Sequence, residues 1–460
     1  MNETVYEKIK YYYELENYTF DNITNNLGRD CVNELIKKRA CVLVKKEREI
    51  SFHFVGAVFY KDLIILVLPK YISRNISENQ KALNMRKIMR ILKVYEKQST
   101  KNKEEEYLIS NLNNTEVSDF ILADFILNDY SRYGYFRKKQ NIVVQGGEGE
   151  IDWDQTINDT TPFFVNSRPY YLETFNKMQV NDDRDVILKI HMWAVAFCYK
   201  NFGLILDYNL HQIDTSINNI KFIGNKDYLI NVLKRELNQT YLDQKVNLLK
   251  SLITLIGKYA NFARSTYMTL YGTRSYALVW QDICSFIFTN EIDKFNRELQ
   301  RPLWINSIEK DINDKKDTFK PDIIKTLSYG ADDFFIVLDA KYYLINFNGK
   351  ELENNPDIND VAKQLLYQKA FEHLKGNVFR NIFLFPSNKT DNLFIPFGFV
   401  NLEFVGSSPI NLVYVSIEKA NDLYLSRSSL SKIQLDEFME VAERHYLLYE
   451  SLKKLKVKSE

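Results

Sequence analysis

The chain has 460 residues, of which 61 are basic and 60 acidic, so its formal net charge at pH 7 is +1. A balance this close to zero excludes a global positive field that attracts nucleic acid, and any DNA contact must come from local patches or from a partner. Four cysteines lie far apart without a CxxC or Cys/His pair, which disfavours structural zinc and a disulfide framework. We expect no signal peptide, because the first residues are not an apolar run, and the longest apolar runs have only the length of a strand. We therefore predict a cytoplasmic protein with no membrane association.

Residues 1–145 are predicted to form a β-rich N-terminal domain. This segment is expected to start as a helix and to continue as strands, including the apolar runs 50–60 and 63–68 around a Lys61-Asp62 turn. Residues 79–137 are charged and helical in pattern. The sheet could bind DNA or dock on another protein, and a scaffold sheet without a ligand is the alternative.

Glycines and acidic residues are concentrated between residues 145 and 157. The cluster lacks the Gly-Lys-Ser/Thr ending of a phosphate loop and its acidity would repel phosphate, so we interpret it as an interdomain hinge or a structural turn. A helical connector is predicted over residues 146–265, because apolar residues recur at helical spacing from about 183 to 263. One long helix is expected from Asp227 to about Lys258.

Two short groups carry the most specific chemical signal, Lys320-Pro321-Asp322 and Asp339-Ala340-Lys341. The second group closes a strand-like run, 334–338, and alternation along a strand places Asp339 and Lys341 on one face. A turn signal at 328–332 allows the two segments to pair, which would bring both carboxylates and the ammonium together. Two carboxylates suit Mg²⁺, which completes its shell with waters and phosphate oxygens. A lysine beside them could orient the attacking water or stabilise charge on a phosphate, which predicts phosphodiester hydrolysis; a solvated surface hairpin is the alternative.

The elements around these groups predict the fold of residues 266–460. A helix is expected over 275–288 with Ser275 as its cap, another over 360–371, and a buried strand over 381–386. Further strands and a terminal helix follow, so we predict a mixed sheet flanked by helices. The whole chain is then an α+β / α/β protein with a β-rich start, a helical middle and this C-terminal core.

The pattern resembles the PD-(D/E)xK nuclease superfamily. Within it, Tyr271-Gly272-Thr273, Val279-Trp280 and Ile283-Cys284 resemble the LlaJI-type restriction endonuclease family, relatives of the McrC subunit of McrBC systems. The runs 54–58 and 68–71 and the junction at 151–157 resemble the same family. The resemblance implies a partner, a hexameric McrB-like AAA+ GTPase, and this chain has no GxxxxGK[ST] motif of its own.

The resemblance also implies further site residues. The family places an acid where this chain has Gln281, so Gln281 or Asp282 is expected to complete the metal shell, although the two lie about 100° apart on a helix. Gln364 resembles a glutamine that some branches place beside the site. Tyr367 and Lys363 could reach backbone phosphate, with ordinary packing or solvation as the alternative for all three.

These observations predict an Mg²⁺-dependent restriction endonuclease subunit, type II/IV-like, that cuts double-stranded DNA when docked on its GTPase. Asp322, Asp339, the carbonyl of Ala340 and Asp282 are the candidate metal ligands, and Asp322, Asp339, Lys341 and Gln364 the candidate catalytic residues. One alternative is a nuclease-fold adaptor that has lost its chemistry and stimulates the GTPase, which Gln281 favours. The other is a stand-alone DNA-binding protein that reads DNA with its N-terminal sheet.

Overall fold

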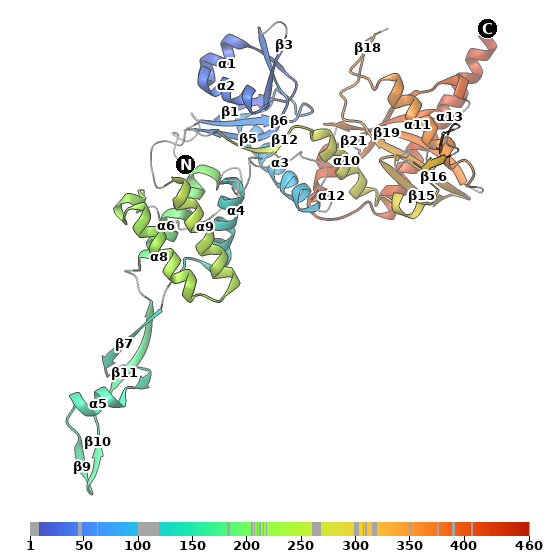
Figure 1. The fold of residues 1–460 in the computed structure, drawn as a ribbon. Coiled ribbons are helices and arrows are strands. Elements are labelled where there is room, and N and C mark those ends of the chain that lie inside the picture. The colour runs from blue at the N-terminus through green and yellow to red at the C-terminus, as the bar shows by residue number, and fades with distance from the viewer. Residues whose placement is uncertain are drawn as a thin grey trace. The chain divides into compact units, whose positions relative to one another are not determined.

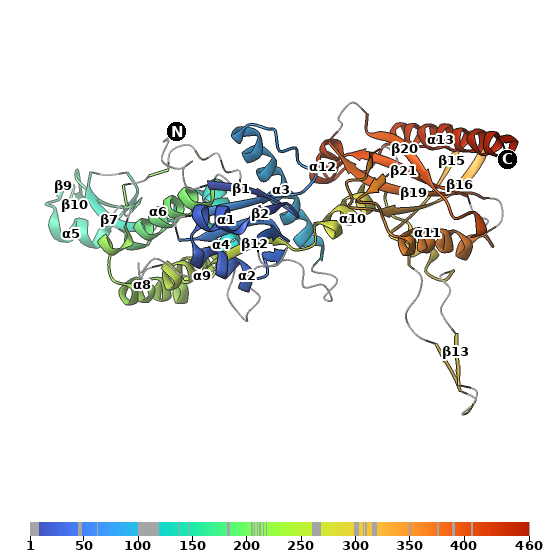
Figure 2. The same ribbon diagram turned by 90° about the horizontal axis from the view of Figure 1, so that it is seen from above.

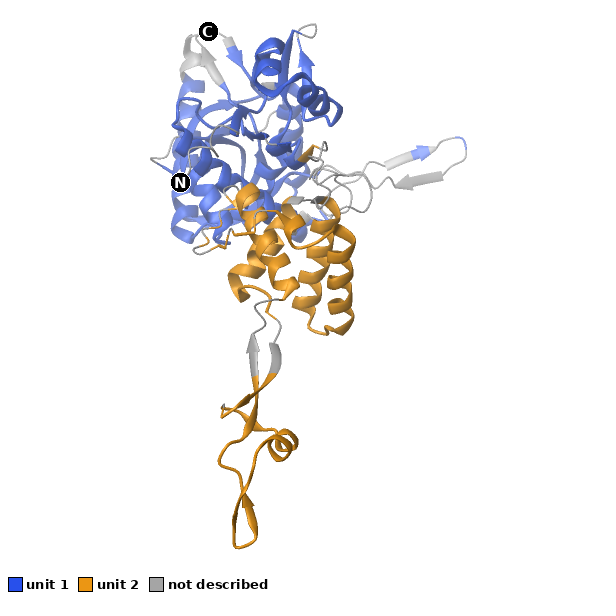
Figure 3. Cartoon of the chain, turned by 90° about the vertical axis from the view of Figure 1, so that its left-hand side faces the viewer, with its two compact units in different colours: residues 1–109, 270–460 blue, residues 110–269 orange. Residues whose placement is uncertain are grey.

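The computed structural model describes residues 9–44, 48–61, 63–99, 119–137, 139–146, 148–181, 185–203, 206, 208, 210, 213–214, 216–217, 219–259, 268–298, 303–306, 308, 311–314, 320–348, 351–374, 377–388, 392–405 and 408–459. These residues divide into two compact units (Figure 3). Unit 1 combines residues 1–109 with 270–460, and unit 2 spans 110–269. The expected borders at 145 and 265 therefore differ from those of the units, because the N-terminal and C-terminal parts of the chain share one unit.

The N-terminal part of unit 1 contains two small sheets (Figure 1). The first has the order β1-β6-β5-β12, with β1 parallel to β6, and the second has the order β2-β4-β3. Helices α1 and α2 precede β3, as the expected helical start predicts, but strand β1 comes before them; residues 1–8 lie outside the described residues. The elements are β1 (Ile9–Tyr13), β2 (Asn17–Thr19), α1 (Phe20–Leu27), α2 (Arg29–Lys37), β3 (Cys41–Val44), β4 (Glu49–Phe52), β5 (Val55–Tyr60), β6 (Leu63–Leu68), α3 (Glu78–Ser99) and β12 (Thr269–Thr273).

The glycine of the Tyr271-Gly272-Thr273 group is explained by a close approach of two strands. A Cβ atom on Gly272 would lie 2.2 Å from the carbonyl oxygen of Val55, and a Cβ on Gly56 would lie 2.2 Å from that of Tyr271. Only residues without a side chain fit at such a crossing. The group leads from the first sheet into the helix that follows, α10 (Tyr276–Ile287).

The C-terminal part of unit 1 is built on a mixed five-stranded sheet with the order β15-β16-β19-β21-β20. β15 and β16 are antiparallel, as the two motif segments predict, and β16, β19 and β21 run parallel. Its elements are α10 (Tyr276–Ile287), η4 (Ile292–Phe295), β13 (Leu303–Asn306), β14 (Asp311–Asp314), β15 (Ile323–Tyr329), β16 (Asp332–Ala340), β17 (Asn346–Asn348), β18 (Glu351–Glu353), α11 (Ile358–Phe371), β19 (Asn377–Ser387), β20 (Phe394–Val400), η5 (Glu403–Val405), β21 (Ile410–Ser416), α12 (Ile417–Leu425) and α13 (Lys432–Ser459).

Helices cover both faces of this sheet, with α11 and α13 on opposite sides (Figure 2). On the α11 face, Phe335 and Val337 of β16 pack in one cluster with Phe371. On the other face, the ring of Phe288 lies 5.9 Å from Phe394 and 5.0 Å from Phe438 of α13, measured between centroids. Alternation along β16 places Asp339 on the same face as Phe335 and Val337, so its carboxylate lies on the α11 side.

Unit 2 combines helices with a β-rich arm. The long helix expected from Asp227 to Lys258 is two helices, because Thr240 caps the first and the second begins at Asp243. The glycine cluster near residue 146 lies inside this unit, between β7 and β8, so it is a turn of the arm rather than a hinge between units. The elements are α4 (Asp119–Tyr133), β7 (Lys139–Gln145), β8 (Glu150–Ile151), α5 (Trp153–Asp159), β9 (Phe163–Val165), β10 (Arg168–Tyr170), β11 (Phe175–Asn181), α6 (Val186–Cys198), η2 (Tyr199–Gly203), η3 (Ile220–Phe222), α8 (Lys226–Gln239) and α9 (Asp243–Tyr259).

Among the described residues, no helix has both the length and the apolar character needed to cross a bilayer.

Candidate active site

The antiparallel register of β15 and β16 brings the two motif groups together. Ile323 lies opposite Leu338, so Asp322 is placed beside Asp339 at the end of the pair. The amide of Ala340 donates to Oδ2 of Asp322 at 3.2 Å, whereas the amide of Lys341 donates to the carbonyl of Leu384 in β19 at 2.9 Å. Since a strand residue directs its N–H and C=O to the same neighbour, the Ala340 carbonyl is directed to the Asp322 side. The structure therefore gathers Asp322, Asp339, Ala340 and Lys341 at one strand end.

Lys341 lies between two carboxylates. Its Nζ is 3.0 Å from Oδ2 of Asp339 and 2.8 Å from Oδ1 of Asp360, in the first turn of α11. Burial alone would lower the pKa of Lys341, but the charges and hydrogen bonds of the two aspartates outweigh it, and the pKa is raised. Lys341 is therefore an ammonium at neutral pH, suited to orienting a water or a phosphate rather than to accepting a proton. Asp360 was not predicted as a site residue.

Asp322 is a buried carboxyl group that faces another carboxyl group. Burial, and then the charge of Asp339 together with a hydrogen bond to it, raise the pKa of Asp322 to about 8. Two side chains hold Asp322 in place: Gln281 donates from Nε2 to Oδ1 at 2.8 Å, and Asn290 donates from Nδ2 to the backbone carbonyl at 2.8 Å. Two carboxyl groups this close cannot both ionise easily without a cation.

Gln281 and Asp282 are adjacent in sequence but face different surroundings. Gln281 reaches Asp322, whereas the Asp282 carboxylate accepts a hydrogen bond from the hydroxyl of Tyr424 in α12. Burial raises the pKa of Asp282, opposed by the Tyr424 hydrogen bond and by the charge of Arg427. The expectation that Asp282 joins the metal shell is corrected, because the rotation of α10 directs this side chain away from Asp322 and Asp339.

The three residues of α11 that were candidates for the site separate by helix face. Lys363 and Tyr367 line the cleft with the acids. Gln364 is fully buried instead, and its Nε2 donates to the carbonyl of Val337 at 2.9 Å. Gln364 therefore supports the strand that carries Asp339, and a catalytic role for it stays a prediction.

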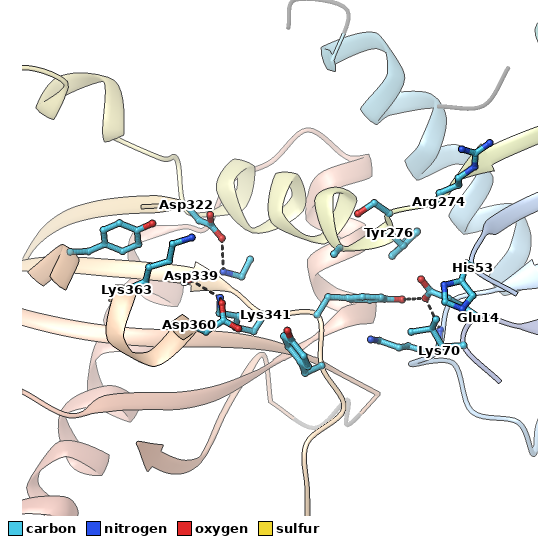
Figure 4. A pocket seen from close by; sticks show the side chains of 17 residues that line it. Glu14, His53, Lys70, Arg274, Tyr276, Asp322, Asp339, Lys341, Asp360 and Lys363 are labelled. Carbon is cyan, nitrogen blue, oxygen red and sulfur yellow. Dashed lines mark hydrogen bonds and ion pairs between the residues drawn. The ribbon is translucent and has the colours of Figure 1, made fainter. Parts of the chain in front are cut away.

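The acids open into a cleft of about 440 Å³ (Figure 4). Its walls come from both parts of unit 1, since Glu14, His53 and Lys70 of the N-terminal part line it together with Asp322 and Asp339. Tyr342 also lines the cleft, and its hydroxyl donates to Oε2 of Glu14 at 2.6 Å. The sequence offered no local signal for this contact, because its two residues are 328 positions apart.

The chemistry of the donor set fits a hard divalent cation. Asp322 and Asp339 supply two carboxylates whose mutual repulsion a cation would relieve, and oxygen ligands are those that Mg²⁺ prefers. The described residues contain no group of three or more His, Cys, Asp or Glu side chains that could hold a metal. Mg²⁺ would therefore take its remaining ligands from the Ala340 carbonyl, from water and from substrate.

Comparison with known proteins places the chain among the components of restriction endonucleases. It belongs to the LlaJI restriction endonuclease family, whose model matches residues 54–418. A relative from Bacillus subtilis (strain 168), described as the type II restriction enzyme BsuMI component YdjA, is 36% identical over 432 residues. The match covers 94% of this chain and 92% of that relative.

Two solved structures show weaker likenesses. A chain from a half-complex of Thermococcus gammatolerans McrB AAA+ hexamers with bound McrC is 12% identical, with a TM-score of 0.37 and coverage of 91% of this chain and 99% of that one. The restriction endonuclease FokI is 10% identical, with a TM-score of 0.17 and coverage of 88% and 81%. Both TM-scores are too low to carry an argument about function.

Proposed function

We propose that this chain is the Mg²⁺-dependent nuclease subunit of a restriction system, with a PD-(D/E)xK core that hydrolyses phosphodiesters of double-stranded DNA in the cytoplasm. The observation that carries the proposal is the convergence of Asp322, Asp339 and Lys341 in one cleft at the end of β16. Two carboxylates beside an ammonium are the groups that metal-assisted phosphodiester hydrolysis needs.

In this proposal each residue of the site has a separate role. Asp322, Asp339 and the Ala340 carbonyl would hold Mg²⁺, which would supply Lewis acidity to the phosphate and to the attacking water. Lys341 orients the attacking water and stabilises charge on the phosphate, and Asp360 fixes the ammonium from its far side at 2.8 Å. Gln281 holds Asp322 through a neutral amide, so it adds no charge to the metal shell.

A partner that supplies nucleotide hydrolysis is the second part of the proposal, since the sequence contains no P-loop. We propose that it is an McrB-like AAA+ GTPase hexamer. The arm of unit 2 suits docking, because its apolar side chains are turned to solvent: Phe164 is 70% exposed, Phe163 62% and Leu172 77%. Exposed apolar groups in such a cluster are typical of protein interaction sites.

The test is plasmid cleavage with Mg²⁺ by the purified chain, alone and with the AAA+ protein and GTP, beside Asp339→Ala and Lys341→Ala. We expect cutting that depends on the partner and is abolished by both substitutions, with Asp339→Ala still folded because it removes a repelled carboxylate. An Asp339→Ala protein that unfolds would contradict the assignment, because the residue would then be structural.

A second candidate function is the adaptor that has lost its chemistry, and the neutral Gln281 beside Asp322 favours it. In that case wild type and both variants would be equally inert on DNA while all of them still accelerate GTP hydrolysis by the partner. The same assay therefore separates the two candidates. A stand-alone DNA reader is not proposed, because the N-terminal sheet shares its cleft with the acids.

A further inference from the structure

The cleft continues beyond the acids to the N-terminal sheet. Its far end is lined by His53, Lys70 and Arg274, which lie on the opposite side of Tyr276 from Asp322 and Asp339 (Figure 4). The phosphodiester chemistry proposed above uses only the end with the acids. The second end therefore needs its own explanation.

The second end has a defined floor, which a buried carboxyl group forms. Glu14 is 6% exposed, and its Oε2 accepts hydrogen bonds from the Tyr342 hydroxyl at 2.6 Å and from the Lys70 amide at 3.3 Å. The Lys70 ammonium lies 4.4 Å from the centre of the Tyr342 ring. Burying a carboxylate is costly unless it is hydrogen-bonded, so these contacts hold Tyr342 and Lys70 in defined positions.

Two cations around the cleft are available to a ligand. The exposed guanidinium of Arg274 donates once, from Nη2 to the carbonyl of Lys38 at 3.0 Å, and has five N–H groups in all. Within the described part of the chain, neither Arg274 nor the exposed Lys363 forms an ion pair. A guanidinium with spare donors binds phosphate oxygens in pairs, and an imidazole such as His53 can add one more donor.

We propose that the N-terminal sheet supplies a phosphate-binding subsite, centred on Arg274 with Lys70 and His53, that holds the DNA backbone next to the phosphate at the acids. The inference rests on the proposed function and extends it by naming where the substrate strand continues. A backbone is favoured over a single free phosphate because the cleft connects this end to the acids, and phosphates repeat along a strand at intervals that such a cleft can follow.

The experiment measures fluorescence anisotropy of a labelled 20-base-pair duplex with the full chain in EDTA, across a series of salt concentrations. Arg274→Gln removes the charge and keeps a polar side chain at this position. We expect the affinity for the duplex to fall about tenfold at low salt. The slope of log affinity against log salt concentration should become shallower by about one, the change that loss of one phosphate contact causes. Arg274→Lys is expected to recover part of the loss, because it keeps the charge but not the paired donors.

Arg29→Ala is the matched control, since Arg29 is an exposed arginine of the same N-terminal part that does not line the cleft. Equal binding by Arg274→Gln and Arg29→Ala, or a wild type that fails to bind the duplex at low salt, would overturn the subsite. A single-stranded probe of the same length tells whether one strand suffices. If wild type binds with the expected Arg274 dependence but never cuts with Mg²⁺ and the partner, the nuclease proposal fails and the subsite stands.

Discussion

Two groups of buried carboxylates in unit 1 are compensated in different ways. Glu14 stands alone and receives hydrogen bonds from Tyr342 and from the backbone of Lys70. At the end of β16, Asp322 and Asp339 face each other, and the ammonium of Lys341 is shared with a third acid, Asp360.

The difference indicates what each group is for. A buried acid whose hydrogen bonds are satisfied holds structure, and Glu14 holds the two parts of unit 1 around the cleft. A cluster with more carboxylates than cations is poised to bind a cation. The predictions below test this contrast.

The largest expected effect is on catalysis. Lys341→Met should lower the rate of Mg²⁺-dependent cleavage by about 10² to 10³, the loss typical for one group that stabilises transition-state charge. Lys325→Met is the matched control, because Lys325 is a buried lysine of the neighbouring strand that binds Thr289 at 2.7 Å outside the cleft. Cleavage per folded molecule should be unchanged in the control, and an equal loss in both variants would assign Lys341 a structural role.

The second effect is a pH dependence of stability. The pKa of Asp322 is raised to about 8, so the native state binds more protons than the unfolded state between about pH 4 and pH 8. The stability that this group contributes therefore falls as the pH rises through that window. Mg²⁺ should raise the melting temperature more at about pH 9 than at about pH 6, because protons compete with the cation for the carboxylate.

Thermal unfolding of wild type and Asp322→Asn, with EDTA and with Mg²⁺ at both pH values, measures this effect. The variant should lose both the pH dependence from this group and most of the stabilisation by Mg²⁺. A wild type that Mg²⁺ stabilises equally at both pH values would mean that Asp322 is already ionised without the cation.

The third effect is on Glu14, the buried acid whose hydrogen bonds are satisfied. Tyr342→Phe removes the hydroxyl that donates to Glu14 and should lower the free energy of unfolding by about 1 to 3 kcal/mol, the cost of a buried polar group left unpaired. Tyr343→Phe, at the next and more exposed position, is the control and should change stability by less than about 0.5 kcal/mol. Denaturant unfolding gives both values. A loss in Tyr342→Phe no larger than in the control would show that Glu14 does not depend on this bond.

The sequence predicts elements correctly where they depend on local contacts and on a periodic pattern of apolar residues. β16, α11, β19 and the pairing of Asp322 with Asp339 follow from alternation, a turn and the helical spacing between them. The Glu14–Tyr342 contact was not predictable, because no pattern in the chain relates residues so far apart. Strand β1 was not predictable for the same reason, because it pairs with β6, which is distant in the sequence.

The different surroundings of Gln281 and Asp282 also could not be predicted from local sequence patterns. Their angular separation on α10 was known, but which of the two faces β15 depends on how the helix is rotated. That rotation is set by distant packing, including the fully buried Trp280, whose Nε1 donates to the Leu384 carbonyl in β19 at 3.3 Å.

The smallest expected effect concerns this pair of residues. Asp282→Asn keeps an oxygen that accepts from Tyr424, so stability should change by less than about 1 kcal/mol and Mg²⁺-dependent cleavage should stay within about twofold of wild type. Gln281→Leu, one position away, removes the donor that holds Asp322 and should lower cleavage clearly more, with the fold intact. Cleavage rates and melting temperatures of the two variants show which of the two side chains contributes to catalysis. If Asp282→Asn lost cleavage without losing stability, Asp282 would belong with the acids that need a cation. Its hydrogen bond from Tyr424 would then not mark it as a structural carboxylate.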